Sequence, residues 1–389
     1  MNIPMLDLKA QYETIKEEIN EKVLGVMASQ NFILGAEVAA LEEEIAASSG
    51  ARFGIGVSSG SDALIISLMA LGIGPGDTVV TTPFTFFATA GAIARLGART
   101  VFCDIDPVTY NIDPASCEEV LNSLSKKRRR LRVKAILPVH LYGQCADMDP
   151  LLKLAGKGGY WIVEDAAQAI GSEYPGRNGL RRAGTMGIAG TLSFYPSKNL
   201  GGYGDGGMVL TDNARLADKL RMLRVHGGIA KYHYKILGGN FRLDALQAAI
   251  LRVKFRHLDD WQEKRRSRAD YYTRKFAESG LEGSGLVKPP LAVYKGCGAR
   301  HYHTYHQYVV RVKNRGRLQA CLKTKGIGTS VFYPLSLHQQ KCFADLGYKK
   351  GDFPVSERAA REVLALPIYP ELTPEQQDYI VETIREFYA

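Results

Sequence analysis

Along the first 250 residues, short apolar runs alternate with segments whose apolar positions recur at helical spacing. Strands are expected at residues 53–57, 78–82, 100–102, 135–139 and 161–164, with a helix at 62–71 and helices across most of 1–50. In the first segment, Val38, Leu41 and Ile45 follow the spacing of one helix face. This alternation predicts a mostly parallel sheet covered by helices.

The pattern changes beyond residue 241. A long helical segment at 242–272, rich in Arg and Lys on one side, leads out of the first domain, and residues 304–312 are expected to form a strand. A chain of 389 residues also exceeds the usual size of one domain. We therefore predict an α/β fold with a large domain at 1–250, including the N-terminal helices, and a smaller C-terminal α/β domain at 251–389.

Composition is that of an ordinary globular enzyme, with 46% hydrophobic and 23% charged residues. Charged residues interrupt the first 21 positions, so no signal peptide or membrane segment is expected and the cytoplasm is the expected location. Six cysteines without a C-x-x-C pair favour reduced thiols over a zinc site or a disulfide framework.

The formal net charge of +10 and the basic run at 126–130 raise the alternative of a nucleic-acid partner. No aromatic residue is interleaved with that run, which lies between an expected helix and an expected strand. We interpret the run as a solvated surface turn and expect no nucleic-acid partner. The overall charge is suited to attracting a small anionic substrate.

Two residues carry the candidate chemistry. Lys198 follows a turn-forming segment and runs into the glycine-rich stretch 201–207, while Asp165 ends the apolar run at 161–164. A carboxylate at the carboxyl end of a buried strand lies where open α/β sheets bind ligands. A lysine amine together with an anionic partner for a ring nitrogen is the pair that pyridoxal phosphate requires.

Ser59, Gly60 and Ser61 follow the strand at 53–57 and open the next helix, which suits a phosphate. The simpler interpretation is an N-cap formed by Ser61 or Asp62. Residues 56–60 also match G-x-S-x-G, the nucleophile motif of α/β-hydrolases. A hydrolase could draw its partners from Asp165 or Asp205 and from His226, but that hypothesis leaves Lys198 without a role.

Two further patterns suggest a dinucleotide site and a metal site, and we favour a simpler interpretation of each. The glycine-rich stretch 201–207 leads into an expected strand rather than a helix, so it predicts a tight turn and not a dinucleotide site. His301, His303 and His306 suggest a metal cluster, yet no cysteine or carboxylate accompanies them. We expect no metal.

Nearly the whole chain resembles the DegT/StrS-type aminotransferases, pyridoxal-phosphate-dependent enzymes of fold type I that act on nucleotide sugars. The resemblance rests on motifs that occur in order: residues 59–64, 83–89, 138–143, 164–168, 193–207, 223–227, 239–249 and 364–367. It implies that Lys198 binds pyridoxal 5′-phosphate as a Schiff base and that Asp165 pairs with the ring nitrogen. Gln168 would lie near the ring hydroxyl, and Phe86 would stack on the ring.

The same resemblance implies a phosphate site made by Gly60, Ser61 and Ser193, completed by Asn240 of a neighbouring subunit. A homodimer with shared active sites follows from that arrangement. The positions expected to contact the nucleotide sugar are Tyr195, Arg242, Tyr333 and His338.

The implied reaction is a ping-pong transfer of the amino group of L-glutamate, released as 2-oxoglutarate, to a nucleotide-linked keto sugar in amino-sugar or cell-surface polysaccharide biosynthesis. Relatives that act as dehydratases carry histidine at the position of Lys198. Many members have histidine where this chain has Phe332, which leaves recognition of the sugar diphosphate open. The preferred substrate is a UDP-linked 3-keto N-acetylhexosamine, and a 4-keto or dTDP-linked sugar is the alternative substrate. A cofactor-binding regulator without turnover is the alternative function.

Overall fold

A seven-stranded sheet, ordered β1-β9-β8-β5-β4-β2-β3, forms the centre of the computed structural model, which describes residues 1–126 and 131–389. Its strands are β1 (Phe53–Val57), β2 (Asp77–Thr81), β3 (Arg99–Phe102), β4 (Arg132–Ile136), β5 (Trp161–Asp165), β8 (Ala189–Ser193) and β9 (Gly207–Thr211). All neighbouring pairs from β8 to β3 are parallel, whereas β9 is antiparallel to both β1 and β8. The predicted mostly parallel sheet is confirmed.

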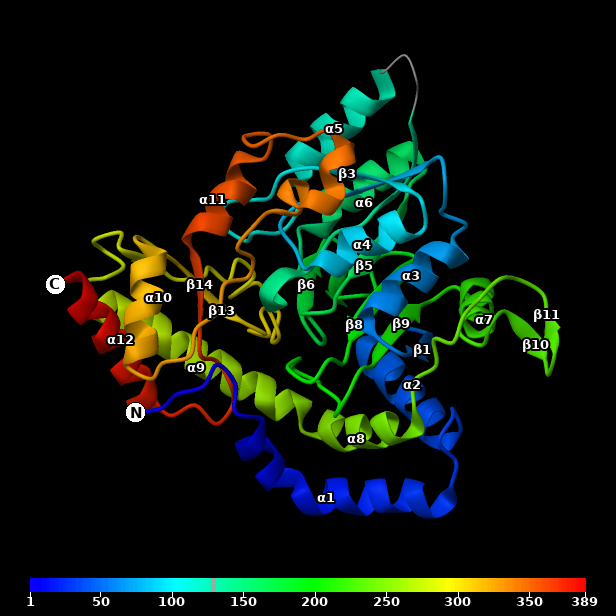
Figure 1. Ribbon diagram of the computed structural model, residues 1–389, viewed down its shortest axis with the longest axis horizontal. Coiled ribbons are helices and arrows are strands. Elements are labelled where there is room, and N and C mark those ends of the chain that lie inside the picture. Colours follow the sequence, from blue (N-terminus) through cyan, green and yellow to red (C-terminus); the bar gives the residue numbers. More distant parts are fainter. Residues whose placement is uncertain (127–130) are drawn as a thin grey trace.

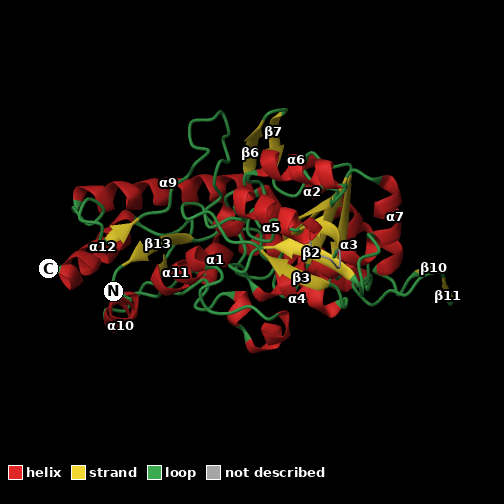
Figure 2. Ribbon diagram, turned by 90° about the horizontal axis from the view of Figure 1, so that it is seen from above, coloured by secondary structure: helices red, strands yellow, loops and turns green. Residues whose placement is uncertain are grey.

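Helices cover both faces of this sheet (Figures 1 and 2). One apolar core joins it to α2 (Ala36–Ser49), α5 (Pro114–Lys126), α6 (Met148–Gly158) and α8 (Ala245–Arg256). Two further cores join it to α3 (Gly60–Ala70), α4 (Phe87–Arg95) and α7 (Ala214–Leu223). Val79 and Val80 of β2 belong to cores on opposite faces, as the alternation of side chains along a strand requires.

A second, smaller sheet contains β12 (Val287–Lys288), β13 (Tyr308–Val312) and β14 (Val363–Leu366), all antiparallel. It packs against α9 (Leu258–Glu278), α10 (Arg315–Thr324) and α12 (Pro374–Tyr388) in its own apolar core. Ile3 also lies in this core, and both chain ends lie on the smaller sheet's side of the molecule in Figure 1. The predicted division at 250/251 falls inside α8, a helix that packs in the core of the large sheet. The domain boundary itself stays a prediction.

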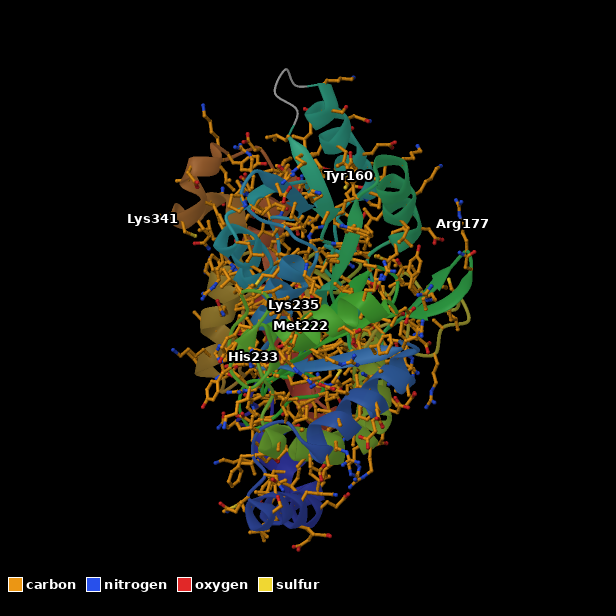
Figure 3. The ribbon with its side chains drawn as sticks, turned by 90° about the vertical axis from the view of Figure 1, so that its right-hand side faces the viewer. Tyr160, Arg177, Met222, His233, Lys235 and Lys341 are labelled. Carbon is orange, nitrogen blue, oxygen red and sulfur yellow. The ribbon has the colours of Figure 1, made fainter. Side chains whose placement is uncertain are left out.

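The remaining elements lie around these two sheets. Helix α1 (Leu8–Ser29) packs on α8, and α11 (Pro354–Glu362) precedes β14. Two antiparallel pairs of short strands are formed by β6 (Glu173–Gly176) with β7 (Gly179–Arg182) and by β10 (Gly228–Ala230) with β11 (His233–Tyr234). The 3-10 helices are η1 (Leu141–Gly143), η2 (Leu337–Gln339) and η3 (Lys341–Leu346). The β10–β11 hairpin projects from the large sheet's end of the molecule; Figure 3 views that side, with His233 and Lys235 labelled.

Three predicted boundaries differ from the structure. The strand expected at 135–139 ends at Ile136, two residues before Pro138, which cannot donate to the ladder. The strand expected at 304–312 begins only at Tyr308, because Tyr305 has a φ of 42° that no extended strand allows. The single helical stretch expected at 242–272 is two helices, α8 and α9, that meet at His257.

The basic run predicted as a surface turn lies outside the described residues except for Lys126, the last residue of α5. None of the helices in the described part of the chain combines the length and the apolar character needed to cross a bilayer.

Candidate active site

Four chain segments reach the same edge of the central sheet. The strands β1, β5 and β8 end there at Val57, Asp165 and Ser193, and β9 begins there at Gly207. Above this edge lies a cavity of about 560 Å³. Strand ends of an open α/β sheet are where such proteins bind ligands, so the topology explains the location of the cavity.

Most of the residues predicted from the sequence line this cavity. They are Gly60, Ser61, Phe86, Asp165, Gln168, Ser193, Tyr195, Lys198 and Tyr333. The segment before β13 contributes His306 and Gln307, which lie in the chain between Tyr305 and Tyr308 of the smaller core. The cavity therefore lies between the two sheets.

The N-terminus of α3 forms one wall. Ser59 is its N-cap, with Oγ accepting a 3.0 Å hydrogen bond from the Asp62 amide. The prediction that Ser61 or Asp62 would be the cap is wrong, because the helix begins at Gly60. A Cβ on Gly60 would lie 2.6 Å from the Cβ of Ser193, so only glycine lets the helix end approach β8 this closely. Backbone amides at the positive end of a helix dipole suit an oxyanion such as a phosphate.

Lys198 lies in the turn after β8. Its backbone amide donates to the carbonyl of Tyr195 at 2.8 Å, which closes that turn. Burial lowers the pKa of Lys198 to about 8, and the negative charge of Asp165 opposes the shift. A larger share of this amine is therefore neutral near physiological pH than for an exposed lysine, which makes it a competent nucleophile.

Asp165 ends β5 and is 5% exposed. Its Oδ2 accepts a 2.8 Å bond from Oγ1 of Thr89, and its Oδ1 accepts a 3.2 Å bond from the Ala167 amide. Burial raises the pKa of Asp165, while the bonds from Thr89 and Ala167 and the nearby charge of Lys198 counteract that rise. A buried carboxylate of this kind gains from a cationic partner, such as a protonated ring nitrogen.

A second buried pair supports the end of β5. His140 Nε2 lies 2.9 Å from an oxygen of Glu164, and both side chains are fully buried. Glu164 also accepts hydrogen bonds from the backbone amides of Gly184, Met186 and Gly187. This network ties the loop after β7 to Glu164, the neighbour of Asp165 in β5.

Gln168 connects the cavity floor to the segment before η2. Its Nε2 donates to the hydroxyl of Tyr333 at 2.9 Å, and its Oε1 accepts from the Tyr142 amide at 2.8 Å. The Tyr142 hydroxyl in turn donates to the carbonyl of Phe332. Phe332, noted above as the position where many similar proteins have histidine, also lines the cavity.

The structure does not bring three predicted residues to this cavity. Asn240 is exposed, and Arg242 is half-buried beside β1, where its backbone pairs with Val57. His338 is 3% exposed and its Nε2 lies 3.1 Å from Oε1 of Glu357, which joins η2 to α11. The lining of the cavity gives no support to a substrate contact by His338.

Sequence reasoning missed Thr89 and Gln307 and considered His306 only as a metal ligand. Thr89 was inside a quoted motif, but its approach to Asp165 spans 76 residues and leaves no local signal. His306 Nδ1 lies 3.3 Å from Oδ1 of Asn199, the neighbour of Lys198. His301 instead contacts Arg266, so these histidines have separate partners.

The hydrolase hypothesis finds no support in this geometry. The hydroxyl of Ser58, the central serine of G-x-S-x-G, donates to Oδ2 of Asp62 at 2.7 Å. His226 does not line the cavity. Ser58 therefore acts with Ser59 in organising the start of α3.

The geometry fits pyridoxal 5′-phosphate group by group. The start of α3 suits the phosphate, Lys198 the aldehyde carbon and Asp165 the ring nitrogen, while the ring of Phe86, 57% exposed, offers an apolar face at the cavity.

Comparisons with known proteins agree with this fit. The profile of the DegT/DnrJ/EryC1/StrS aminotransferase family matches residues 13–385. A relative from Geobacillus stearothermophilus named pleiotropic regulatory protein is 53% identical, covering 100% of this chain and 99% of its own. A UDP-N-acetyl-3-dehydro-alpha-D-glucosamine 3-aminotransferase from Acidithiobacillus ferrooxidans is 42% identical, with 98% and 97% covered.

Among solved structures, DesV of Streptomyces venezuelae in complex with a ketimine intermediate has a TM-score of 0.90. It is 38% identical, and the match covers 99% of this chain and 98% of DesV. The fold is therefore that of the fold type I enzymes, and the cofactor is pyridoxal 5′-phosphate. The chain belongs to the DegT/DnrJ/EryC1/StrS aminotransferase family and is a sugar aminotransferase that acts on nucleotide-linked keto sugars.

Proposed function

We propose that the chain transfers the amino group of L-glutamate to a UDP-linked 3-keto N-acetylhexosamine. The cavity that joins Lys198, Asp165 and the start of α3 is the observation that carries the reaction class. The choice of sugar draws on the 42% identical relative, which is named for a UDP-linked 3-dehydro-glucosamine. A 4-keto or dTDP-linked sugar is the alternative.

The bound cofactor supplies an aldehyde and an electron-withdrawing ring. In the proposal, Lys198 would hold the cofactor through its amine, and the free amine would move the proton of the donor's α-carbon as general base and then acid. Asp165 keeps the ring nitrogen protonated, since an adjacent carboxylate favours the cation. Gln168 and Phe86 orient the ring, and Gly60, Ser61 and Ser193 bind the phosphate.

The keto sugar then receives the amino group in the reverse sequence, with Lys198 again transferring the proton. Tyr195 and Tyr333 line the cavity and are proposed to contact the sugar nucleotide. Arg242 lies outside the cavity of its own chain, so a substrate contact by Arg242 requires movement or a neighbouring subunit.

We also propose a homodimer with shared sites. Asn240 is exposed and absent from the cavity of its own chain, which suits a contact to the phosphate bound by a partner. Mixing inactive Lys198→Ala chains with inactive Asn240→Ala chains should restore some turnover through hybrid dimers. Complete absence of restored activity in verified mixed dimers would contradict the shared site.

The decisive test is a half-reaction. Wild-type protein loaded with the cofactor should convert fully to the pyridoxamine form when L-glutamate is added, and a UDP-linked 3-keto sugar should reverse that absorbance change. A panel of UDP- and dTDP-linked 3-keto and 4-keto sugars then identifies the acceptor. Lys198→Ala should abolish both half-reactions.

A regulatory function is the second candidate, because the 53% identical relative is named a pleiotropic regulatory protein. The same half-reaction separates the two functions. A binding protein without turnover would hold the cofactor and show no conversion with L-glutamate.

A further inference from the structure

Lys254 is a buried cation that the proposed reaction does not use. It lies on α8, is 1% exposed, and donates from Nζ to the carbonyl of Gly201 at 2.6 Å. Its ammonium also lies 5.0 Å from the centre of the Tyr203 ring. Among the described residues, no carboxylate acts on this ammonium.

Keeping an unpaired ammonium in the interior is costly. Burial lowers the pKa of Lys254 to about 8, which reflects that cost. A methionine of similar length would fill the space without desolvating a charge. The hydrogen bond to Gly201 is therefore the specific contribution of a lysine at this position.

Gln247 contacts the same loop from the same helix face, seven residues earlier. Its Oε1 accepts a 2.8 Å bond from the amide of Tyr203. A Cβ on Gly202 would lie 2.7 Å from that oxygen, and a Cβ on Gly204 would lie 2.9 Å from its Nε2. The glycines of this loop thus allow its backbone to lie directly against α8.

On its other side, the loop contacts the turn that carries Lys198. A Cβ on Gly201 would lie 2.3 Å from the carbonyl oxygen of Pro196, within that turn. The Gly202 amide donates to the carbonyl of Phe194 at 2.8 Å. A continuous path of contacts therefore runs from Lys254 through Gly201 to the turn that holds Lys198.

We propose that Lys254 is a positioning residue: its hydrogen bond to Gly201, supported by Gln247, fixes the glycine loop and thereby holds the Lys198 amine in the cavity. The inference rests on the proposed function only in taking Lys198 as the reactive amine. Without the Lys254 donor, the buried carbonyl of Gly201 loses its partner and the loop loses one of its two attachments to α8.

The test compares wild-type holoenzyme with Lys254→Met, Gln247→Leu and Lys219→Met. Lys219 is a matched control, because its Nζ donates to the carbonyl of Ala70 at 2.7 Å, away from the glycine loop. Amide hydrogen exchange of peptides spanning 199–206 is the first measurement. Lys254→Met should raise exchange in this segment about tenfold or more, Gln247→Leu should raise it in the same segment, and Lys219→Met should leave it unchanged.

Steady-state kinetics and the pH titration of the lysine–cofactor absorbance provide readouts that a purely structural role would not move. Lys254→Met should lower kcat about tenfold, with KM for the amino donor changed less than about twofold, and should shift the midpoint of the titration. Lys219→Met should match wild type in both.

Exchange at 199–206 within twofold of wild type in both loop variants would overturn the proposal. So would faster exchange spread evenly over all peptides together with a lowered Tm, because that pattern indicates general destabilisation. Exchange does not depend on the substrate, so a wild-type protein without transamination would refute the proposed function and leave this test of the loop intact.

Discussion

Thr89 donates a 2.8 Å hydrogen bond to Oδ2 of Asp165, and the hydroxyl of Thr85 lies 3.0 Å from that of Thr89. Because Thr89 uses its proton toward Asp165, Thr85 is the donor in the second bond. The chain of hydroxyls therefore ends on the carboxylate that is expected to pair with the ring nitrogen. Each link favours the ionised form of Asp165 in a site where burial opposes it.

Replacing Thr89 by valine should raise the pKa of Asp165 further, since the bond that lowers it is lost. A hydrogen bond to a charged group contributes about 1.5–3 kcal/mol, so turnover near the acid limb should fall about tenfold or more. Because protonation of Asp165 would then begin at higher pH, the acid limb of the kcat profile should shift to higher pH. Thr89→Ser keeps the hydroxyl and should lie near wild type; an unmoved acid limb in Thr89→Val would contradict the role.

Lys198 should titrate near pH 8 in the cofactor-free protein. Only the neutral amine attacks the aldehyde, so the rate of imine formation should rise with pH and level off above about 8 rather than above about 10.4. Stopped-flow absorbance after addition of pyridoxal phosphate measures this rate. In Asp165→Asn the carboxylate no longer favours the ammonium, so the midpoint should move to lower pH.

The same shift has a consequence for stability. Because the pKa of Lys198 is lower in the folded than in the unfolded chain, the unfolded chain binds more protons between the two values. The stability of wild type relative to Lys198→Met should therefore increase as the pH rises from about 8 to about 10.4, and should be constant below that window. Urea unfolding of both cofactor-free proteins at several pH values checks the sign.

Gly60→Ala should weaken cofactor binding. The added Cβ would lie 2.6 Å from the Cβ of Ser193, so the start of α3 must move away from the phosphate position. We expect a loss of affinity of at least about tenfold, measured by titration of the cofactor-free protein. Gly25→Ala in α1 meets nothing within 4 Å and is the control for a glycine replaced in a helix; it should stabilise the fold by about 0.5–1 kcal/mol and leave affinity unchanged.

The sequence was sufficient for the parts of the site that depend on strand ends. Asp165 was recognisable because it ends an apolar strand, and Lys198 because it follows a turn pattern after another strand; both line the cavity. The cap of α3 was misplaced because Ser59, Ser61 and Asp62 all have capping side chains, and only the backbone decides between them. The substrate contact predicted for His338 stays a prediction, and the burial of His338 against Glu357 could not be read from the sequence because it depends on how η2 packs on α11.

The protonation state of His306 could not be predicted from the sequence, because it depends on contacts that only the fold creates. Asn199 Nδ2 donates to the carbonyl of Thr304 at 2.9 Å, which turns its Oδ1 toward Nδ1 of His306. Nδ1 therefore carries the proton, and Nε2 of this cavity residue is left as an acceptor. Burial, together with the charge of Lys198, lowers the pKa of His306 well below its ordinary value, so the ring should stay neutral throughout the working pH range.

We expect His306→Phe, which replaces the imidazole by an apolar aromatic ring and removes the acceptor, to lower turnover without shifting the acid limb of the pH profile, because His306 itself does not titrate in that range. Nitrogen NMR of histidine-labelled protein should show one ring with a fixed Nδ1–H tautomer from about pH 5.5 to about 8.5, a range in which an ordinary histidine titrates. Asn199→Leu removes the acceptor for Nδ1–H and should release this tautomer. A His306 ring, assigned by its loss in His306→Phe, that titrates near pH 6.5 in the wild-type protein would show that the Asn199–His306 pair does not control its protonation.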